Sequence, residues 1–241
     1  PPNLESIESC AFNLCYNLSS VNIPDGVTFI GVLAFSYCQL TSIDIPNSVT
    51  QIGSQVFRGC PLSSVNIPAS VRIISPNPFY GCEPLASITV DAGNPVYSSP
   101  NGCNAIIKTD EHRLISGCKN TVIPNDVTEI NDNAFSDCTG LSSIEIPASV
   151  EIINDYAFKG CFNLEYITVL AETPPIISIY SENCFNGVPS TIPVYVPYQS
   201  VSAYKNATGW NHFTNFIGIV TIGDETSINT DYTLPVNMDY N

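Results

Sequence analysis

The chain has 241 residues, of which 22 are acidic and 7 are basic, so its net charge is −15. A chain of this length can bury a large core in one or two domains. Its charge disfavours nucleic acid as a partner, because the phosphates would repel it. No apolar run approaches the ~20 residues of a membrane span, so we expect no direct membrane insertion.

A repeat is already present at the N-terminus, where Pro1 and Leu4 to Phe12 match Pro24 and Val27 to Phe35. The chain thus starts inside a repeat, which indicates a processed or trimmed start and says little about compartment. Further copies read LSSVNIPDGVTFIGVLAFSYC, LTSIDIPNSVTQIGSQVFRGC and LSSIEIPASVEIINDYAFKGC. The repeat phenylalanine recurs at intervals of 23, 22, 22, 56, 23 and 27 residues, at Phe12, Phe35, Phe57, Phe79, Phe135, Phe158 and Phe185.

Each copy contains two short strand signals. Leu-x-Ser-Ile-x-Ile alternates apolar and polar residues before a proline that ends the strand, and Ser-Val-x-x-Ile forms the second signal. The following Ala-Phe-x-x-Cys is too short for a full helix, so we expect a turn or a single helical turn that inserts the phenylalanine into the core. One copy cannot bury its apolar side alone, whereas stacked copies can, with rungs ~4.8 Å apart. The sequence therefore predicts a mainly β solenoid.

This pattern resembles the BspA-type leucine-rich repeat family, whose units read L-x-x-I-x-I-P-x-S-V-x-x-I-G-x-x-A-F-x-x-C. The resemblance covers about residues 1–170 and implies a right-handed stack of rungs with short parallel strands. It also implies a non-enzymatic surface or adhesion role, since such repeats occur in secreted and surface-anchored bacterial proteins.

The regular spacing breaks between Phe79 and Phe135, where a variant repeat spans about residues 91–123. Its segment CNAIIKTDEHRLISGC predicts a projecting β-hairpin that pairs Ile107 with Leu114 and Cys103 with Cys118. The hairpin is either a recognition feature or, more often for such insertions, a tolerated addition. The residues expected at its tip are Asp110, Glu111, His112 and Arg113.

Beyond residue 170 the repeat fades. Residues 192–197 predict a strand, and residues 200–208 have helical periodicity and precede the only tryptophan, Trp210. Residues 216–222 predict a final strand. Because the open end of a solenoid needs covering, we expect residues 171–222 to form a C-terminal cap. Residues 223–241 are polar and acidic and are predicted to be an exposed tail or a linker.

One outward-facing position lies between the two buried isoleucine positions of each first strand. We predict that this column, together with the neighbouring Tyr166, forms a binding face, although a solvated sheet surface is the default explanation. Its two acids lie several rungs apart, too far to act as a general acid and base on one bond. The column consists of Asn22, Asp44, Asn66, Thr89, Glu145 and Thr168.

Six of the ten cysteines lie three residues after a repeat phenylalanine and should stack as a ladder. Rungs ~4.8 Å apart place Cβ atoms slightly beyond disulfide separation, so we expect buried thiols. The hairpin register does allow a disulfide between Cys103 and Cys118. No Cys-x-x-Cys occurs and neither histidine has a companion ligand, so no metal and no cofactor are expected. The ladder cysteines are Cys15, Cys38, Cys60, Cys82, Cys138 and Cys161.

The leading functional interpretation is an extracellular binding or adhesion module, secreted or at the cell surface. The abundance of Ser, Thr and Asn and the scarcity of Lys suit an extracellular β-protein. Its partner would be a host or microbial protein or a glycan, bound by a monomer through the solenoid face. The alternatives are a structural stalk within a larger surface protein and, less favoured, a carbohydrate-active enzyme built on a solenoid.

Overall fold

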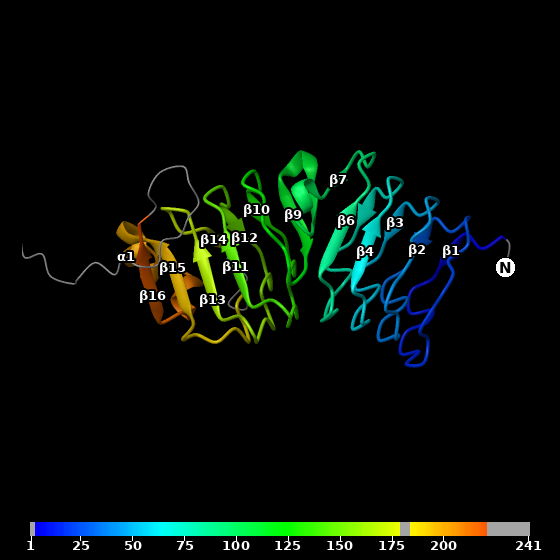
Figure 1. The fold of residues 1–241 in the computed structure, drawn as a ribbon, viewed down its shortest axis with the longest axis horizontal. Helices are drawn as coiled ribbons and strands as arrows, with labels where there is room; N and C mark the ends of the chain where they lie inside the picture. Colours follow the sequence, from blue (N-terminus) through cyan, green and yellow to red (C-terminus); the bar gives the residue numbers. More distant parts are fainter. Residues whose placement is uncertain (1–2, 179–183, 221–241) are drawn as a thin grey trace, which may run out of the picture.

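The computed structural model describes residues 3–178 and 184–220. It confirms the predicted β solenoid: the molecule is elongated, and successive rungs follow one another from β1 to β16 (Figure 1). The predicted tail, residues 223–241, lies outside the described residues.

The second strand signal of each rung forms two parallel sheets that run along one side of the solenoid. The first sheet has the order β1-β2-β3-β5. Its strands are Ser6–Ile7, Phe29–Ile30, Gln51–Ile52 and Ile73–Ile74. The second sheet ends in three parallel strands in the order β14-β12-β10. Their bounds are Ile176–Ile177, Ile152–Ile153 and Glu129–Ile130.

The first strand signal forms the opposite wall, again as parallel strands. One sheet joins β4 to β6, and the other has the order β11-β13-β15-β16. Buried and exposed residues alternate along β4 and β11, so their apolar residues face the core. The bounds are Ser64–Ile67 and Ser87–Val90 for the first sheet, and Ser143–Ile146, Tyr166–Val169, Pro193–Pro197 and Asn215–Ile219 for the second.

The repeat phenylalanines stack directly on one another. Phe35 and Phe57 have ring centroids 5.8 Å apart and ring planes 4° from parallel, and Phe135 stacks on Phe158 at 5.1 Å. All four are at most 1% exposed. Because stacked aromatic rings attract one another and bury a large apolar area, this column stabilises each rung against the next.

The six repeat phenylalanines from Phe12 to Phe158 are each held by a turn with two left-handed residues instead of a helix. The residues two before and two after the phenylalanine have positive φ, as at Gln55 (53°) and Gly59 (65°) around Phe57. Glycine suits the second position, since a Cβ at Gly59 would lie 2.7 Å from the Tyr37 ring. Backbone bonds join successive turns, for example from Phe35 N–H to the Val56 carbonyl at 2.9 Å.

The serine of each Ser-Val pair links neighbouring rungs as well. The Ser48 hydroxyl donates to the Val27 carbonyl, and the Ser70 hydroxyl donates to the Val49 carbonyl, both at 2.7 Å. Ser149 donates to Val127 in the same way. The repeated serine is therefore explained by a hydrogen bond between rungs at the point where the strand begins.

The hairpin does not project from the solenoid as predicted. Its strands continue the second sheet in the order β10-β9-β8-β7, because β9 pairs in parallel with β10. The three strands are β7 (Tyr97–Ser98), β8 (Ala105–Lys108) and β9 (Arg113–Gly117), with 3-10 turns at Pro100–Gly102 and Thr109–Glu111. The hairpin is thus an integral part of the stack.

Both faces of this hairpin are buried, and they separate two cores. Ile106 and Ile115 belong to the N-terminal core, which begins at Ile7. Ile107 and Leu114 belong to the C-terminal core, which extends to Phe213. The hairpin therefore acts as an internal wall between two stacks of rungs.

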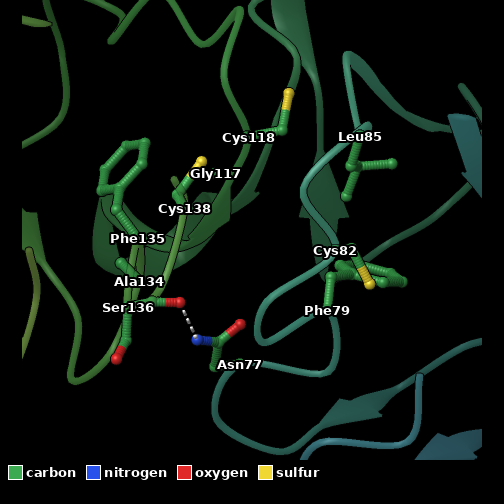
Figure 2. A pocket seen from close by; sticks show the side chains of 10 residues that line it. All are labelled: Asn77, Phe79, Cys82, Leu85, Gly117, Cys118, Ala134, Phe135, Ser136 and Cys138. Atoms are coloured by element: carbon green, nitrogen blue, oxygen red, sulfur yellow. Dashed lines mark hydrogen bonds between the residues drawn. The ribbon is translucent and has the colours of Figure 1, made fainter. Parts of the chain in front are cut away.

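The phenylalanine column is interrupted where these cores meet (Figure 2). Phe135 packs against Gly117 of β9, where an added Cβ would lie 2.1 Å from the ring atom Cε1. Asn77 donates from its side-chain amide to the Ser136 carbonyl at 3.3 Å and so joins the two stacks. The cavity between Phe79 and Phe135 has a volume of about 10 Å³, at the lower limit for one water molecule.

Aromatic side chains cover the last rung. Trp210 and Tyr204 are fully buried; the indole N–H donates to the Pro175 carbonyl at 2.8 Å, and the Tyr204 hydroxyl donates to the Ala171 carbonyl at 2.7 Å. Tyr204 lies on α1 (Val201–Asn206), between 3-10 turns at Tyr198–Ser200 and Trp210–His212. This packing supports the proposal that residues 171–222 cap the solenoid.

Candidate functional site

Five residues of the outward column are exposed and one is not. Thr168 is only 3% exposed, so the expectation of an outward, accessible side chain was wrong at this position. The register explains why, since Thr168 lies between Glu145 on one side and Tyr195 on the other. The exposed members are Asn22, Asp44, Asn66, Thr89 and Glu145.

In the N-terminal stack, two residues of the column, Asn66 and Thr89, form side-chain hydrogen bonds. The Asn66 amide donates to the Asp91 carboxylate at 2.9 Å, and its carbonyl oxygen accepts from the Thr89 hydroxyl at 2.8 Å. These two side chains are therefore already engaged within the protein. Glu145 and Asp44 differ, because neither carboxylate forms a hydrogen bond or ion pair in the described part of the chain.

Glu145 borders a surface groove of about 200 Å³. Two other residues of the predicted face, Tyr166 and Thr168, line it with Glu145, so the structure brings three of the seven predicted residues together. Tyr166 is 41% exposed, and its ring forms a T-shaped contact with the Tyr195 ring at a centroid distance of 5.9 Å. The remaining lining residues are Thr121, Val122, Ile123, Ser143 and Ile144.

The groove lies beside a rung that is shorter than its neighbours. Six positions separate Cys118 from Pro124, whereas eight separate Cys38 from Pro46 and nine separate Cys138 from Pro147. Residues 121–123 form no strand, as is also true of residues 41–45 in the longer rung Cys38–Pro46, and no backbone hydrogen bond joins residues 121–123 to β11. Thr121, Val122 and Ser143 were missed from the sequence, and this shortened interval was the signal that could have indicated them.

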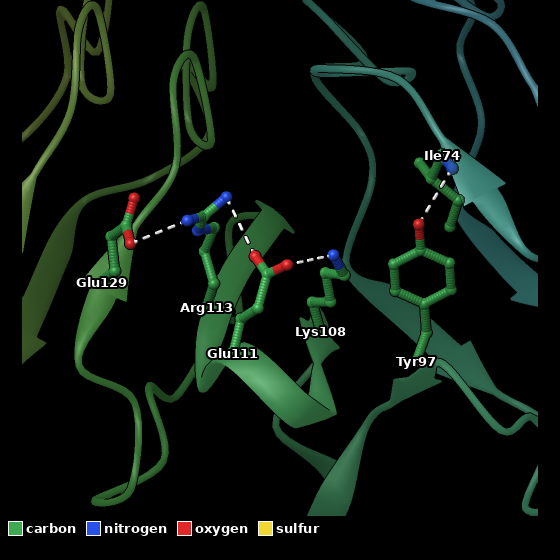
Figure 3. Close-up of polar contacts among 6 residues, drawn as sticks. All are labelled: Ile74, Tyr97, Lys108, Glu111, Arg113 and Glu129. Carbon is green, nitrogen blue, oxygen red and sulfur yellow. Dashed lines mark hydrogen bonds and ion pairs between the residues drawn. The ribbon is translucent and has the colours of Figure 1, made fainter.

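Two residues of the predicted hairpin tip are occupied by contacts within the protein (Figure 3). Glu111 pairs with Lys108 and lies 3.0 Å from the Arg113 guanidinium, which in turn lies 3.1 Å from Glu129 of β10. The hydrogen bond between Lys108 and Glu111 raises the pKa of the ammonium and lowers the pKa of the carboxyl. Asp110 and His112 stay exposed, with His112 Nδ1 3.6 Å from Asp126.

Four cysteines of the ladder are buried: Cys38, Cys60, Cys82 and Cys161. Each thiol donates to the phenylalanine carbonyl of the preceding rung, as from Cys60 to Phe35 at 3.0 Å. Burial raises the pKa of Cys60 to about 12, so this thiol stays protonated at neutral pH.

Two ladder positions differ from the prediction. Cys15 is exposed and Cys138 is partly exposed. Cys15 lies in the first described rung, and Cys138 lines the small cavity at the junction of the two stacks.

Cys103 and Cys118 are free thiols in the structure, so the disulfide that the sequence allowed is not formed. A bulge at Ile106 and Ile107 shifts the hairpin register by one residue, and Ala105 therefore pairs with Gly117. The Cys118 thiol donates to the Asn104 carbonyl at 3.3 Å.

Residues 3–178 and 184–220 contain neither a candidate metal site nor a membrane-spanning helix. Within these ranges, His, Cys, Asp and Glu side chains do not gather in groups of three or more that could hold a metal ion. The helices there are all too short or too polar to cross a bilayer.

A BspA type leucine rich repeat region, in six copies, matches residues 2–101 and 107–230. No curated protein matches the chain. A leucine-rich repeat protein from Bacteroides ovatus ATCC 8483 is similar in structure, with 27% identity, a TM-score of 0.54, and coverage of 91% of this chain and 53% of that one. This chain therefore spans about half the length of that protein.

Two further solved structures share the fold. One is a leucine-rich repeat protein from Eubacterium ventriosum ATCC 27560, at 20% identity and a TM-score of 0.56, covering 88% of this chain and 69% of that one. The other is a leucine rich cell surface protein from Faecalibacterium prausnitzii A2-165, at 22% identity and a TM-score of 0.54, covering 96% and 74%. With its repeats, its solenoid and the family match, this chain belongs to the BspA type leucine-rich repeat family.

Proposed function

We propose that this chain is an extracellular interaction module that binds a protein or glycan through its outward solenoid face. The family and a cell-surface relative from Faecalibacterium prausnitzii favour a surface location and an interaction role. The observation that carries the proposal is the groove beside β11, where an unpaired carboxylate and a half-exposed tyrosine lie together. Aromatic side chains are over-represented at the energetic centres of interfaces.

The test is a binding screen of the purified chain against immobilised extracellular-matrix proteins and a glycan array. The double variant Asp44→Lys/Glu145→Lys reverses both acids of the face. The matched control, Asp25→Lys/Asp126→Lys, makes the same change of charge in the turns after Pro24 and Pro124. Deleting residues 103–118 is not a usable test, because both cores pack on the hairpin.

We expect the face variant to lose at least one interaction that the control retains. If the face variant keeps every interaction of the wild type, the chain is a spacer and the proposal is wrong.

A further inference from the structure

The groove beside β11 has the features of an acceptor site for a β-strand. Building on the function proposed above, we infer that a partner protein adds an extended peptide segment to the free edge of β11, with a Lys or Arg of that segment facing Glu145.

One edge of β11 is not paired with another strand of the described chain. The Ile146 carbonyl accepts from Leu170 N–H at 2.9 Å, so the even-numbered residues of β11 point their backbone groups toward β13. Backbone groups alternate in direction along a strand, so those of Ser143 and Glu145 point to the opposite edge. No backbone hydrogen bond links that edge to residues 121–123. Two N–H groups and two carbonyls therefore face the groove, which is how a free edge accepts another strand.

The walls of the groove include apolar and aromatic side chains. Val122 is 69% exposed on one side and Tyr166 is 41% exposed on the other, while Ile123 and Ile144 contribute to the lining between them. A strand that pairs with the edge would point alternate side chains toward these apolar surfaces and toward solvent. The groove beside the shortened rung has a volume of about 200 Å³, which gives an external strand room to enter.

The negative charge at the groove and over the whole chain favours a cationic partner segment. Glu145 forms no ion pair within the described residues, and the chain as a whole carries a net charge of −15. A cationic side chain opposite Glu145 forms a charge-assisted hydrogen bond with the carboxylate. Its aliphatic stem can also pack on the Tyr166 ring. An acidic segment would instead be repelled by the whole field of the protein.

The experiment uses the complete chain and a synthetic peptide, acetyl-Thr-Val-Lys-Val-Thr-amide, with a second peptide in which Glu replaces Lys. Hydrogen exchange followed by NMR reports the backbone amides of Ser143 and Glu145, and titration reports affinity. In the free protein these two amides should exchange fast, whereas Ile144 N–H, which points toward β13, should exchange slowly. The Lys peptide should slow the exchange of both amides, and the Glu peptide should not bind.

Two variants separate strand addition from a nonspecific contact. Glu145→Gln keeps the shape of the side chain and should weaken the Lys peptide about tenfold, as loss of a charged hydrogen-bond partner implies. Inserting Ser-Ser between Thr121 and Val122 restores the Cys-to-Pro interval of the rung Cys38–Pro46. It should close the groove, protect both amides and abolish peptide binding.

Three results would overturn the inference. The first is slow exchange of Ser143 and Glu145 in the free protein, and the second is equal binding of the Lys and Glu peptides. The third is binding of maltohexaose in the groove without protection of these amides, which would make the site a glycan site. If the partner found in the surface screen is lost in the Asp44→Lys/Glu145→Lys variant but unaffected by the Ser-Ser insertion, strand addition fails while the proposed function stands.

Discussion

The regular rungs and the hairpin region bury their apolar side chains in different ways. In the regular rungs the same contacts recur from rung to rung: each phenylalanine stacks on the next, while the serine and the buried cysteine donate to a valine and a phenylalanine carbonyl of the preceding rung. In the hairpin region Gly117 receives the Phe135 ring, and Asn77 bridges the two stacks. The regular rungs build the scaffold, whereas the shortened interval after Cys118 leaves the opening where binding is proposed.

Thiol reactivity should show the largest contrast between buried and exposed positions. Of the ten cysteines, Cys10 and Cys15 are exposed, while burial raises the pKa of Cys60 to about 12. Only the thiolate reacts, so at about pH 8 Cys60 should be alkylated at least about a thousandfold more slowly than the exposed pair. Mass spectrometry after brief iodoacetamide treatment should find label on Cys10 and Cys15. Rapid labelling of Cys60 in the folded protein would contradict the buried ladder.

Removing a ring from the middle of the column should cost more than removing one from its end. Phe57 is fully buried between two stacked rings, whereas Phe12 is 37% exposed at the N-terminal end. We expect Phe57→Ala to lower the free energy of unfolding by about 3–5 kcal/mol and Phe12→Ala to lower it clearly less. Urea unfolding followed by circular dichroism measures both. Equal losses of unfolding free energy in the two variants would show that burial between stacked rings is not the main contribution of these phenylalanines to stability.

A methyl group added at Gly117 should destabilise the protein, because at this junction the Phe135 ring packs on a glycine and not on another phenylalanine ring. A Cβ at Gly117 would clash with the Phe135 ring, whereas a Cβ at Gly93 would meet its nearest neighbour, Ala69 Cβ, at an ordinary 3.6 Å. We expect Gly117→Ala to cost about 1–3 kcal/mol, as overpacking does. Gly93→Ala should leave the unfolding midpoint nearly unchanged. If both variants unfold alike, the junction is looser than described.

The ion pairs of the hairpin should contribute least. Lys108 lowers the pKa of Glu111, so the ionised carboxyl stabilises the folded state above its unfolded pKa of about 4.3, and this contribution is lost as the pH falls through the lowered pKa. Glu111→Gln should therefore slightly lower the melting temperature at neutral pH and low salt. The difference from wild type should vanish in about 1 M salt, where charges are screened. A difference that persists in high salt would point to packing.

The sequence predicted the repeated parts of the fold because each rung carries the same residues at the same offsets. The hairpin was predicted from its own pattern, but its place in the sheet depends on pairing with β10, which that pattern does not contain. The bulge at Ile106 and Ile107 moved Cys103 out of the predicted register for the same reason. Of the candidate site, the sequence indicated Glu145, Tyr166 and Thr168. It did not indicate that a groove lies between them and the shortened interval Cys118–Pro124, because the groove appears only once the neighbouring rungs are stacked.

The most direct test of the central claim compares two charge reversals in one column, Glu145→Lys at the groove and Asp44→Lys in a regular rung. Each is measured by surface plasmon resonance against the partner found in the binding screen. The account predicts that Glu145→Lys abolishes binding and that Asp44→Lys leaves it within about twofold, since one rim charge contributes little. Equal losses in both variants, or a loss confined to Asp44→Lys, would contradict it.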